Sequence, residues 1–113
     1  MEDLQARGLL EETLVVVMGE MGRTPKVNGS GGRDHWTQCY SVLMSGAGIR
    51  GGTVHGASDA QAAYPDRDPV GPGDICASIY HCLGIDPEMP VVDPLGRPIP
   101  IAHGGRPIRP ILL

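Results

Sequence analysis

Two runs of aliphatic residues predict strands in the first half of the chain. Residues 13–20, TLVVVMGE, hold five consecutive apolar side chains, the pattern of a strand buried on both faces in a parallel sheet covered by helices. Residues 40–49, YSVLMSGAGI, predict a second, shorter strand near 40–45. In α/β proteins the polar loop after such a buried strand is where ligands bind. Gly19 and Glu20 therefore occupy a position at which chemistry is common.

The clearest helix pattern covers residues 71–84. Pro72 suits the first helical position, the acidic Asp74 suits the first turn, and Gly84 suits the position just after the helix. Apolar residues recur at helical spacing, so we expect a helix over 72–83 that packs through one face. That expected face comprises Ile75, Ile79, Cys82 and Leu83.

Turn-forming residues dominate the remainder of the chain. Residues 2–9 predict one or two helical turns that end at a glycine. Residues 22–33 and 57–70 are polar and rich in turn formers, and they predict long loops. Prolines and glycines alternate with aliphatic pairs over 85–113, which predicts short edge strands and a hairpin around residues 94–96.

Length and composition limit the architecture. The chain has 113 residues, of which 41% are hydrophobic, and it contains 17 glycines and 11 prolines. We therefore expect residues 1–113 to form a single small α/β domain with many ordered turns. Its expected parts are a strand and site-loop region over 13–56, a packing helix over 71–84 and a Pro/Gly-rich C-terminal segment over 85–113.

The charge pattern excludes several classes of function. The net charge is −4 without long charged blocks, so we expect neither a nucleic acid nor an anionic membrane as a partner. No segment has the apolar length of a membrane span, and the N-terminus MEDLQARGLLEET lacks the pattern of a signal peptide. The three cysteines are odd in number and form no Cys-x-x-Cys pair, which indicates neither a disulfide framework nor a zinc-thiolate site.

Several candidate functional side chains lie in residues 31–36, GGRDHW. One interpretation is a metal or catalytic site, and the other is a surface turn in which Asp34 hydrogen-bonds to the backbone and His35 is exposed. Neighbouring side chains on an extended chain point to opposite sides, so Asp34 and His35 are not expected to face one ion together. We favour His35 as the ligand, with Asp34 orienting a ligand or Arg33.

Glu20 and Arg23 each have two interpretations. Glu20 is either a metal ligand or general base, or the counter-ion of Arg23. Arg23 is either a clamp for two oxygens of a sulfate or phosphate, to which a planar guanidinium is suited, or the partner of Glu20. Trp36 is expected to be a packing anchor whose indole N–H finds one acceptor.

Several long motifs carry a resemblance to a known family. They are VVVMGEMGRTP, GRDHW, SVLMSGAGIRGGTVHGASD, GDICASIYHCLGIDP and DPLGRPIPI, which together run from about Thr13 to Leu113. In this order they resemble the C-terminal part of the sulfatase-like domain-of-unknown-function family 1501, placed in the alkaline phosphatase/sulfatase superfamily. The resemblance implies an α/β sandwich whose mixed central sheet carries metal ligands on the loops at its strand ends.

The resemblance also implies roles for individual residues. Glu20 stands where relatives begin an Asp-His or Asp-Asn ligand pair, and His35 stands near a later metal-binding histidine of the superfamily. We therefore expect a metal site formed by His35, Glu20 and Asp34, in which Asp34 acts on a ligand, and Glu20 and Arg23 as catalytic residues. An imidazole ligand favours zinc or manganese over calcium. Because Gly19 and Glu20 replace the Asp-His pair, a two-metal centre of the superfamily type is not implied.

The family pattern also contains parts that this sequence lacks. Relatives draw the nucleophile and the first acidic ligands from an N-terminal half, and the sequence here begins about where their last third does. We therefore expect a partial hydrolase of sulfate or phosphate esters that is inactive alone. The alternative is a non-catalytic, self-associating module of the same fold. A doubly covered strand in so short a chain predicts a homo-oligomer or a companion polypeptide. Full-length relatives are typically exported, although this chain carries no signal peptide.

Overall fold

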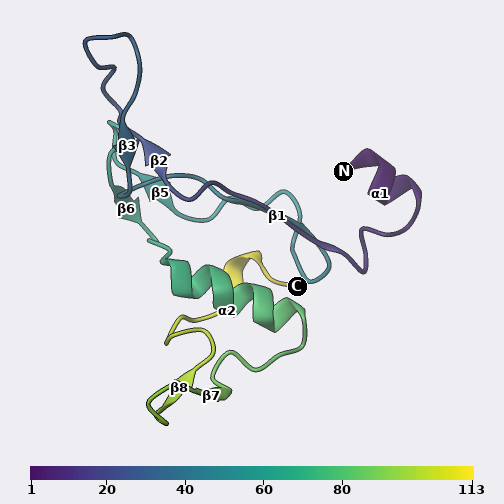
Figure 1. Ribbon diagram of the computed structural model, residues 1–113. Coiled ribbons are helices and arrows are strands. Elements are labelled where there is room, and N and C mark those ends of the chain that lie inside the picture. Colours follow the sequence, from purple (N-terminus) through teal and green to yellow (C-terminus); the bar gives the residue numbers. More distant parts are fainter. The chain divides into compact units, whose positions relative to one another are not determined.

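The computed structural model describes all residues, Met1–Leu113, in two compact units (Figure 1). The first unit comprises Met1–Leu14, Ser45–Thr53 and Val70–Leu113, and the second comprises Val15–Met44 and Val54–Pro69. Short helices are combined with four sheets of two strands each, and the registers determined for three of these pairs are antiparallel. The chain is therefore α/β in general. No helix is both long enough and apolar enough to cross a membrane.

Both strands expected from the aliphatic runs are present. β1 spans Leu14–Val17 and pairs with β4, which spans Leu43–Gly46. The expectation that β1 is buried on both faces is wrong. Its residues are half-buried or exposed, and Val17 is 59% exposed. The physical reason is that a sheet of two strands gives each strand one neighbour, and no element of the chain covers both of its faces.

The helix α2 spans Pro72–Cys82, within a residue of the expected range. Its start is fixed as the sequence predicts, because Pro72 is the first helical residue and the Asp74 carboxylate accepts a hydrogen bond from the Gly71 N–H at 2.9 Å. At the other end Gly84 has a φ of +73°, a conformation that glycine adopts without strain. The short helix α1, Glu2–Ala6, lies in the same unit.

The packing face of α2 differs from the expected stripe. Ala77 and Ser78 are completely buried, whereas Ile75 and Ile79 are only half-buried and Leu83 is 61% exposed. The reason is that the C-terminal segment after strand β8 (Pro98–Pro100) covers α2, and it approaches the side of the helix that carries small residues (Figure 1). Close backbone contact excludes long side chains there.

Ser78 joins α2 to that C-terminal segment. Its hydroxyl donates to the Asp74 carbonyl oxygen at 2.7 Å and accepts a hydrogen bond from the Ile108 N–H at 3.0 Å. Ile108 is only 8% exposed, so a water molecule would not replace the hydroxyl as the acceptor for this N–H.

Replacing Ser78 by alanine is expected to lower the free energy of unfolding by about 1–3 kcal/mol, the cost of a buried N–H left without an acceptor. Chemical denaturation followed by circular dichroism measures the change. Cys76→Ala is the matched control, because Cys76 lies exposed on the same helix and its loss should change stability little. Equal stability of Ser78→Ala and wild type would contradict the role assigned to the hydroxyl.

The C-terminal segment forms the expected hairpin. β7, Pro90–Val92, pairs antiparallel with β8, Pro98–Pro100, and Val91 lies opposite Ile99. The Asp93 carboxylate closes the turn by accepting hydrogen bonds from the backbone N–H groups of Leu95 at 2.8 Å and Arg97 at 2.9 Å. The same carboxylate pairs with the Arg97 guanidinium at 2.7 Å.

A small apolar core closes the first unit. The last turn is a 3₁₀ helix, η1, over Arg109–Ile111, followed by an isolated bridge between Ile49 and Leu112. Ile49 and Leu112 are buried, as are Ala102 and Ile108. The chain end is thus held against the segment that follows β4.

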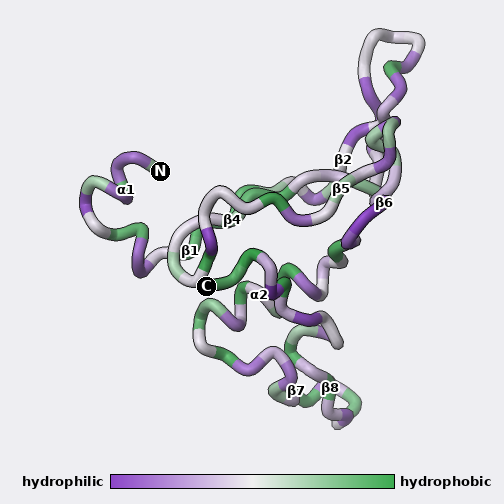
Figure 2. The backbone as a smooth tube through the Cα atoms, turned by 180° about the vertical axis from the view of Figure 1, so that it is seen from behind, coloured by the Kyte–Doolittle hydropathy of each residue, from purple (hydrophilic) through white to green (hydrophobic).

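The second unit contains two hairpins where the sequence predicts loops. β2, Gly22–Arg23, pairs with β3, His35–Trp36, and β5, Ala57–Ser58, pairs with β6, Pro65–Arg67. Strands of two or three residues are too short to show an alternating pattern, so periodicity could not reveal them. All three residues of β6 are exposed, and Figure 2 shows its strongly hydrophilic character.

Candidate functional site

The β2–β3 hairpin brings together two of the candidate site residues. Arg23 and His35 lie directly opposite one another in the antiparallel register, next to the pair formed by Gly22 and Trp36. Opposed residues in such a register share one face of the sheet, with Cβ atoms about 4.5–5.5 Å apart. Both side chains are exposed, and neither takes part in an ion pair of the structure. A guanidinium and an imidazole are therefore displayed side by side.

Gly22 fixes this hairpin against the segment that follows it. A Cβ at this position would overlap the Cys39 carbonyl oxygen and would lie 3.0 Å from the Trp36 carbonyl oxygen and from Tyr40 Cβ. Only glycine fits such a close approach of backbone to backbone. The register that pairs Arg23 with His35 thus depends on the glycine beside it.

Trp36 is the packing anchor that the sequence predicts. Its indole N–H donates a hydrogen bond to the Ala63 carbonyl oxygen at 2.6 Å. Its ring also meets the Tyr64 ring edge to face, with centroids 5.5 Å apart and an interplanar angle of 66°. Trp36 therefore joins β3 to the turn between β5 and β6. That turn is closed by Asp59, whose carboxylate accepts a hydrogen bond from the Ala63 N–H at 2.8 Å.

Asp34 serves the loop before β3. Its Oδ1 accepts a hydrogen bond from Asn28 Nδ2 at 3.0 Å, and its backbone N–H donates to Thr24 Oγ1 at 3.1 Å. Of the two expected roles of Asp34, orienting a metal ligand or orienting Arg33, the second is not observed. The Arg33 guanidinium donates instead to the carbonyl oxygens of Thr24, at 2.7 Å, and Pro25, because these backbone acceptors lie within reach of its long side chain.

Asn28 organises the long loop between β2 and β3, a role that the sequence predictions missed. Its Oδ1 accepts hydrogen bonds from Ser30 N–H at 3.1 Å, Ser30 Oγ at 3.0 Å and Gly32 N–H at 2.9 Å. The Asn-Gly pair at 28–29 was an available signal, since asparagine side chains commonly cap turns in this way. The loop projects from the strands with its own internal hydrogen bonds (Figure 1).

Glu20 stands apart from the other candidates. It is exposed, and no ion pair or hydrogen bond of the structure involves its carboxylate. Its expected alternative role as the counter-ion of Arg23 is therefore not observed. No group of three or more His, Cys, Asp and Glu side chains is arranged to hold a metal ion. The structure pairs Arg23 with His35, and no hydrogen bond or ion pair joins the carboxylate of Glu20 or of Asp34 to either side chain.

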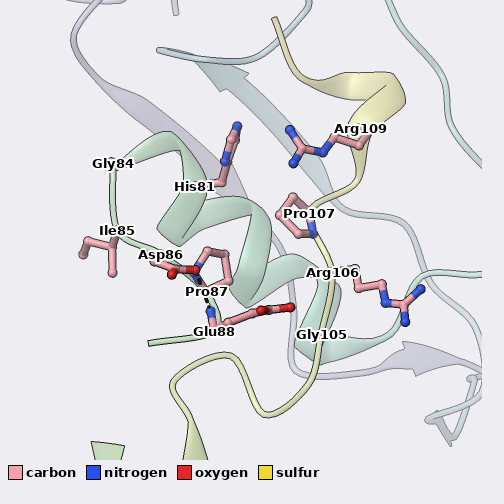
Figure 3. A pocket seen from close by; sticks show the side chains of 10 residues that line it. All are labelled: His81, Gly84, Ile85, Asp86, Pro87, Glu88, Gly105, Arg106, Pro107 and Arg109. Carbon is pink, nitrogen blue, oxygen red and sulfur yellow. Dashed lines mark hydrogen bonds between the residues drawn. The ribbon is translucent and has the colours of Figure 1, made fainter. Parts of the chain in front are cut away.

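A hollow in the first unit was not expected from the sequence. It has a volume of about 470 Å³ and lies beside the C-terminal end of α2. Figure 3 shows His81 and Arg109 at its upper side and Asp86 and Glu88 at its lower side. Arg106 also lines it, so two guanidinium groups are balanced by two carboxylates. This balance favours neither an anionic nor a cationic ligand.

Comparison with known proteins identifies the family. A family model described as Protein of unknown function (DUF1501) matches residues 1–112. The chain belongs to the DUF1501 family. No curated protein and no solved structure matches it. The DUF1501 match confirms the family named from the motifs, and it includes both the β2–β3 hairpin and the hollow beside α2. Because the DUF1501 description states no activity, it assigns a role to neither.

Proposed function

We propose that this chain is the metal-site-bearing C-terminal part of a sulfatase- or phosphatase-like hydrolase of sulfate or phosphate esters. The observation that carries the proposal is the register of β2 and β3, which places Arg23 beside His35. A guanidinium binds two oxygens of a sulfate or phosphate group through parallel hydrogen bonds. A neighbouring imidazole supplies either a further hydrogen bond or a metal ligand. The α/β sandwich of the alkaline phosphatase/sulfatase superfamily belongs to this proposal.

The side chains available as ligands can be compared with what the proposed divalent metal, zinc or manganese, requires. His35 offers a nitrogen of the kind that transition metals prefer, and Glu20 a carboxylate two residues before β2. Stable zinc sites in proteins use three or four protein ligands, however, and the chain arranges no three donors together. The residues present therefore do not fit a complete site. We propose His35 as one ligand of a site that is incomplete within these 113 residues, and expect little or no ester turnover by the chain alone.

Zinc titration of the purified chain tests the ligand assignment. Wild type is expected to bind zinc weakly, and His35→Ala to bind it at least about tenfold more weakly, the loss typical of a perturbed metal site. His81→Ala is the matched control, because His81 is also exposed and lies in the last turn of α2. Calorimetric isotherms that coincide for wild type and His35→Ala would overturn the assignment.

Titration with inorganic sulfate and phosphate tests the anion site separately. Arg23→Ala is expected to abolish the chemical-shift changes that these ions cause in the amide signals of β2 and β3. Arg7→Ala is the control, because it removes an exposed arginine from the end of α1 and leaves the hairpin intact. If Arg23→Ala responds to the ions as wild type does, Arg23 is not an anion clamp.

A non-catalytic, self-associating module is the second candidate function. Exposed apolar side chains on β1 and β4 favour it, since Val17 is 59% and Leu43 is 53% exposed. A second copy, or a companion polypeptide, that covers these strands would bury both residues, and a stable interface is expected to exceed about 1,000 Å² in total. Light scattering over a range of concentrations distinguishes a dimer from a monomer. A monomer at the highest concentration would contradict the proposal of self-association.

A further inference from the structure

The loop between β2 and β3 contains Asn28 followed by Gly29, and Asn28 is the only asparagine in the chain. We propose that Asn28 is a site of spontaneous deamidation in the folded protein, where its side-chain amide is converted to a carboxylate. The reaction is intramolecular and needs only water as a co-reactant. It is independent of the function proposed above.

The nucleophile is the backbone nitrogen of Gly29. Its N–H donates to no acceptor in the structure, unlike those of Ser30, Gly31 and Gly32. A Cβ built on Gly29 would meet no atom within 4 Å, so no neighbouring atom crowds the glycine on that side. Groups held next to one another in one chain react with a high effective concentration. The Gly29 nitrogen is therefore available to the Asn28 side-chain carbonyl carbon, Cγ.

The electrophile is held in a setting that favours attack. Asn28 Oδ1 accepts three hydrogen bonds, from Ser30 N–H, Ser30 Oγ and Gly32 N–H, at 2.9–3.1 Å. When a nitrogen adds to Cγ, negative charge develops on Oδ1, and donors already aimed at that oxygen stabilise it. The leaving group, Nδ2, is hydrogen-bonded to Asp34 Oδ1 at 3.0 Å.

The chemical steps balance without an oxidant or reductant. The Gly29 nitrogen forms a bond to Asn28 Cγ and loses its proton, and the Cγ–Nδ2 bond then breaks. Nδ2 leaves as ammonia after taking up a proton, and a five-membered succinimide remains. Water adds to either carbonyl carbon of this ring and opens it to aspartate or isoaspartate. In total, one amide and one water give one carboxylic acid and one ammonia.

The product changes the interactions that organise the loop. A carboxylate would replace the Nδ2 donor that now lies 3.0 Å from Asp34 Oδ1, so an attractive contact becomes a repulsion between two negative charges. The Asp34 backbone is paired with Thr24 and directly precedes His35. Deamidation therefore acts on the loop that joins Arg23 to His35, and Asn28→Asp imitates one of its two products.

Peptide mapping of aged protein tests the proposal. The folded chain and the chain unfolded in urea are incubated at the same mildly alkaline pH and temperature, and then digested with trypsin. Cleavage after Lys26 and Arg33 releases residues 27–33, which contain Asn28 as their only asparagine. Chromatography separates the asparagine, aspartate and isoaspartate forms, and mass spectrometry identifies them. We expect the folded chain to deamidate at least as fast as the unfolded one.

Two variants separate the effect of the folded structure on the deamidation rate from the effect of the Asn-Gly sequence. Ser30→Ala removes one donor to Asn28 Oδ1 and is expected to slow the reaction about fivefold to tenfold in the folded chain, the effect of one hydrogen bond, with no change in urea. Gly29→Ala is expected to slow it in both states. Gly51→Ala, another substitution into open space, serves as the control that leaves the rate unchanged.

Two outcomes would overturn the proposal. One is a folded chain that deamidates more slowly than the unfolded chain, because the fold would then protect Asn28. The other is a Ser30→Ala variant that keeps the wild-type rate when folded, which would remove the role of the donors. Circular dichroism and thermal melting confirm that each variant is folded before its rate is compared.

Discussion

Gly105→Ala is expected to destabilise the first unit by at least about 3 kcal/mol, the upper range for overpacking a tightly packed site. A Cβ on Gly105 would overlap the carbonyl group of Gly73 and lie 2.6 Å from the Asp74 nitrogen. These are backbone atoms at the start of α2, so they cannot rotate away as a side chain would. Relief requires the C-terminal segment to separate from the helix that it covers.

Denaturant unfolding measured by circular dichroism checks this expectation. Gly51→Ala is the control, because Gly51 lies in the same unit and a Cβ added there would have no atom within 4 Å. Its substitution should leave the free energy of unfolding within about 0.5 kcal/mol of wild type. A Gly105→Ala variant that unfolds at the wild-type midpoint would show that helix and tail are not in close backbone contact.

Asp74→Ala is expected to lower the free energy of unfolding by about 2–4 kcal/mol, since hydrogen bonds to a charged group are each worth about 1.5–3 kcal/mol. Its carboxylate accepts from the Gly71 N–H at 2.9 Å and from the Arg106 N–H at 2.8 Å. The first bond caps α2, and the second ties the C-terminal segment to the helix start. Glu11→Ala removes an exposed, unbonded carboxylate of the same unit and is the control.

The pH dependence follows from the same two bonds. The Arg106 N–H, followed by the Gly71 N–H, lowers the pKa of Asp74 below its ordinary value of 3.8. A carboxyl group whose pKa is lower in the folded state stabilises the fold fully above its unfolded pKa, and this stabilisation is lost as the pH falls through the folded value. The stability gap between wild type and Asp74→Ala should therefore be constant above about pH 5 and shrink as the pH falls below about 4.

Thermal melting at a series of pH values measures that gap. The pKa of Asp93 is also lowered, chiefly by the Arg97 N–H and guanidinium, but Asp93 is present in both proteins and its effect cancels in the difference. A gap that stays constant down to about pH 2.5 would mean that folding leaves the pKa of Asp74 unchanged, which would contradict the role assigned to its two N–H donors.

Helices, strands and turns that are formed by interactions between neighbouring residues were predictable from the sequence. Pro72, Asp74 and Gly84 mark the ends of α2 because each satisfies a requirement of the helix terminus itself. The β7–β8 hairpin was predictable because its turn over 93–97 is closed by a neighbouring carboxylate. The aliphatic runs located β1 and β4 for a similar reason, since such residues favour extended backbone wherever they occur.

The candidate site was predictable only in part. The glycine-rich approach to His35 and the position of Arg23 singled out both residues, but their pairing could not be read from the chain. Their register is fixed by Gly22 against the Cys39 carbonyl and by Trp36 on the β5–β6 turn, contacts between distant segments. Glu20 was expected beside them because it follows a predicted strand and because of the family resemblance, and in the structure no hydrogen bond or ion pair joins it to either residue.

The sequence by itself located α2, β1, β4 and the β7–β8 hairpin in this DUF1501 chain, because these elements depend on neighbouring residues. It did not locate the hairpins β2–β3 and β5–β6, whose strands are only two or three residues long. Only the tertiary structure decided which surfaces meet. Hydrophobic spacing marked Ile75 and Ile79 as the packing face of α2, yet the buried residues are Ala77 and Ser78. The physical reason is that the partner is a backbone segment at Gly105, and close approach of two backbones selects small side chains whatever the spacing of large ones.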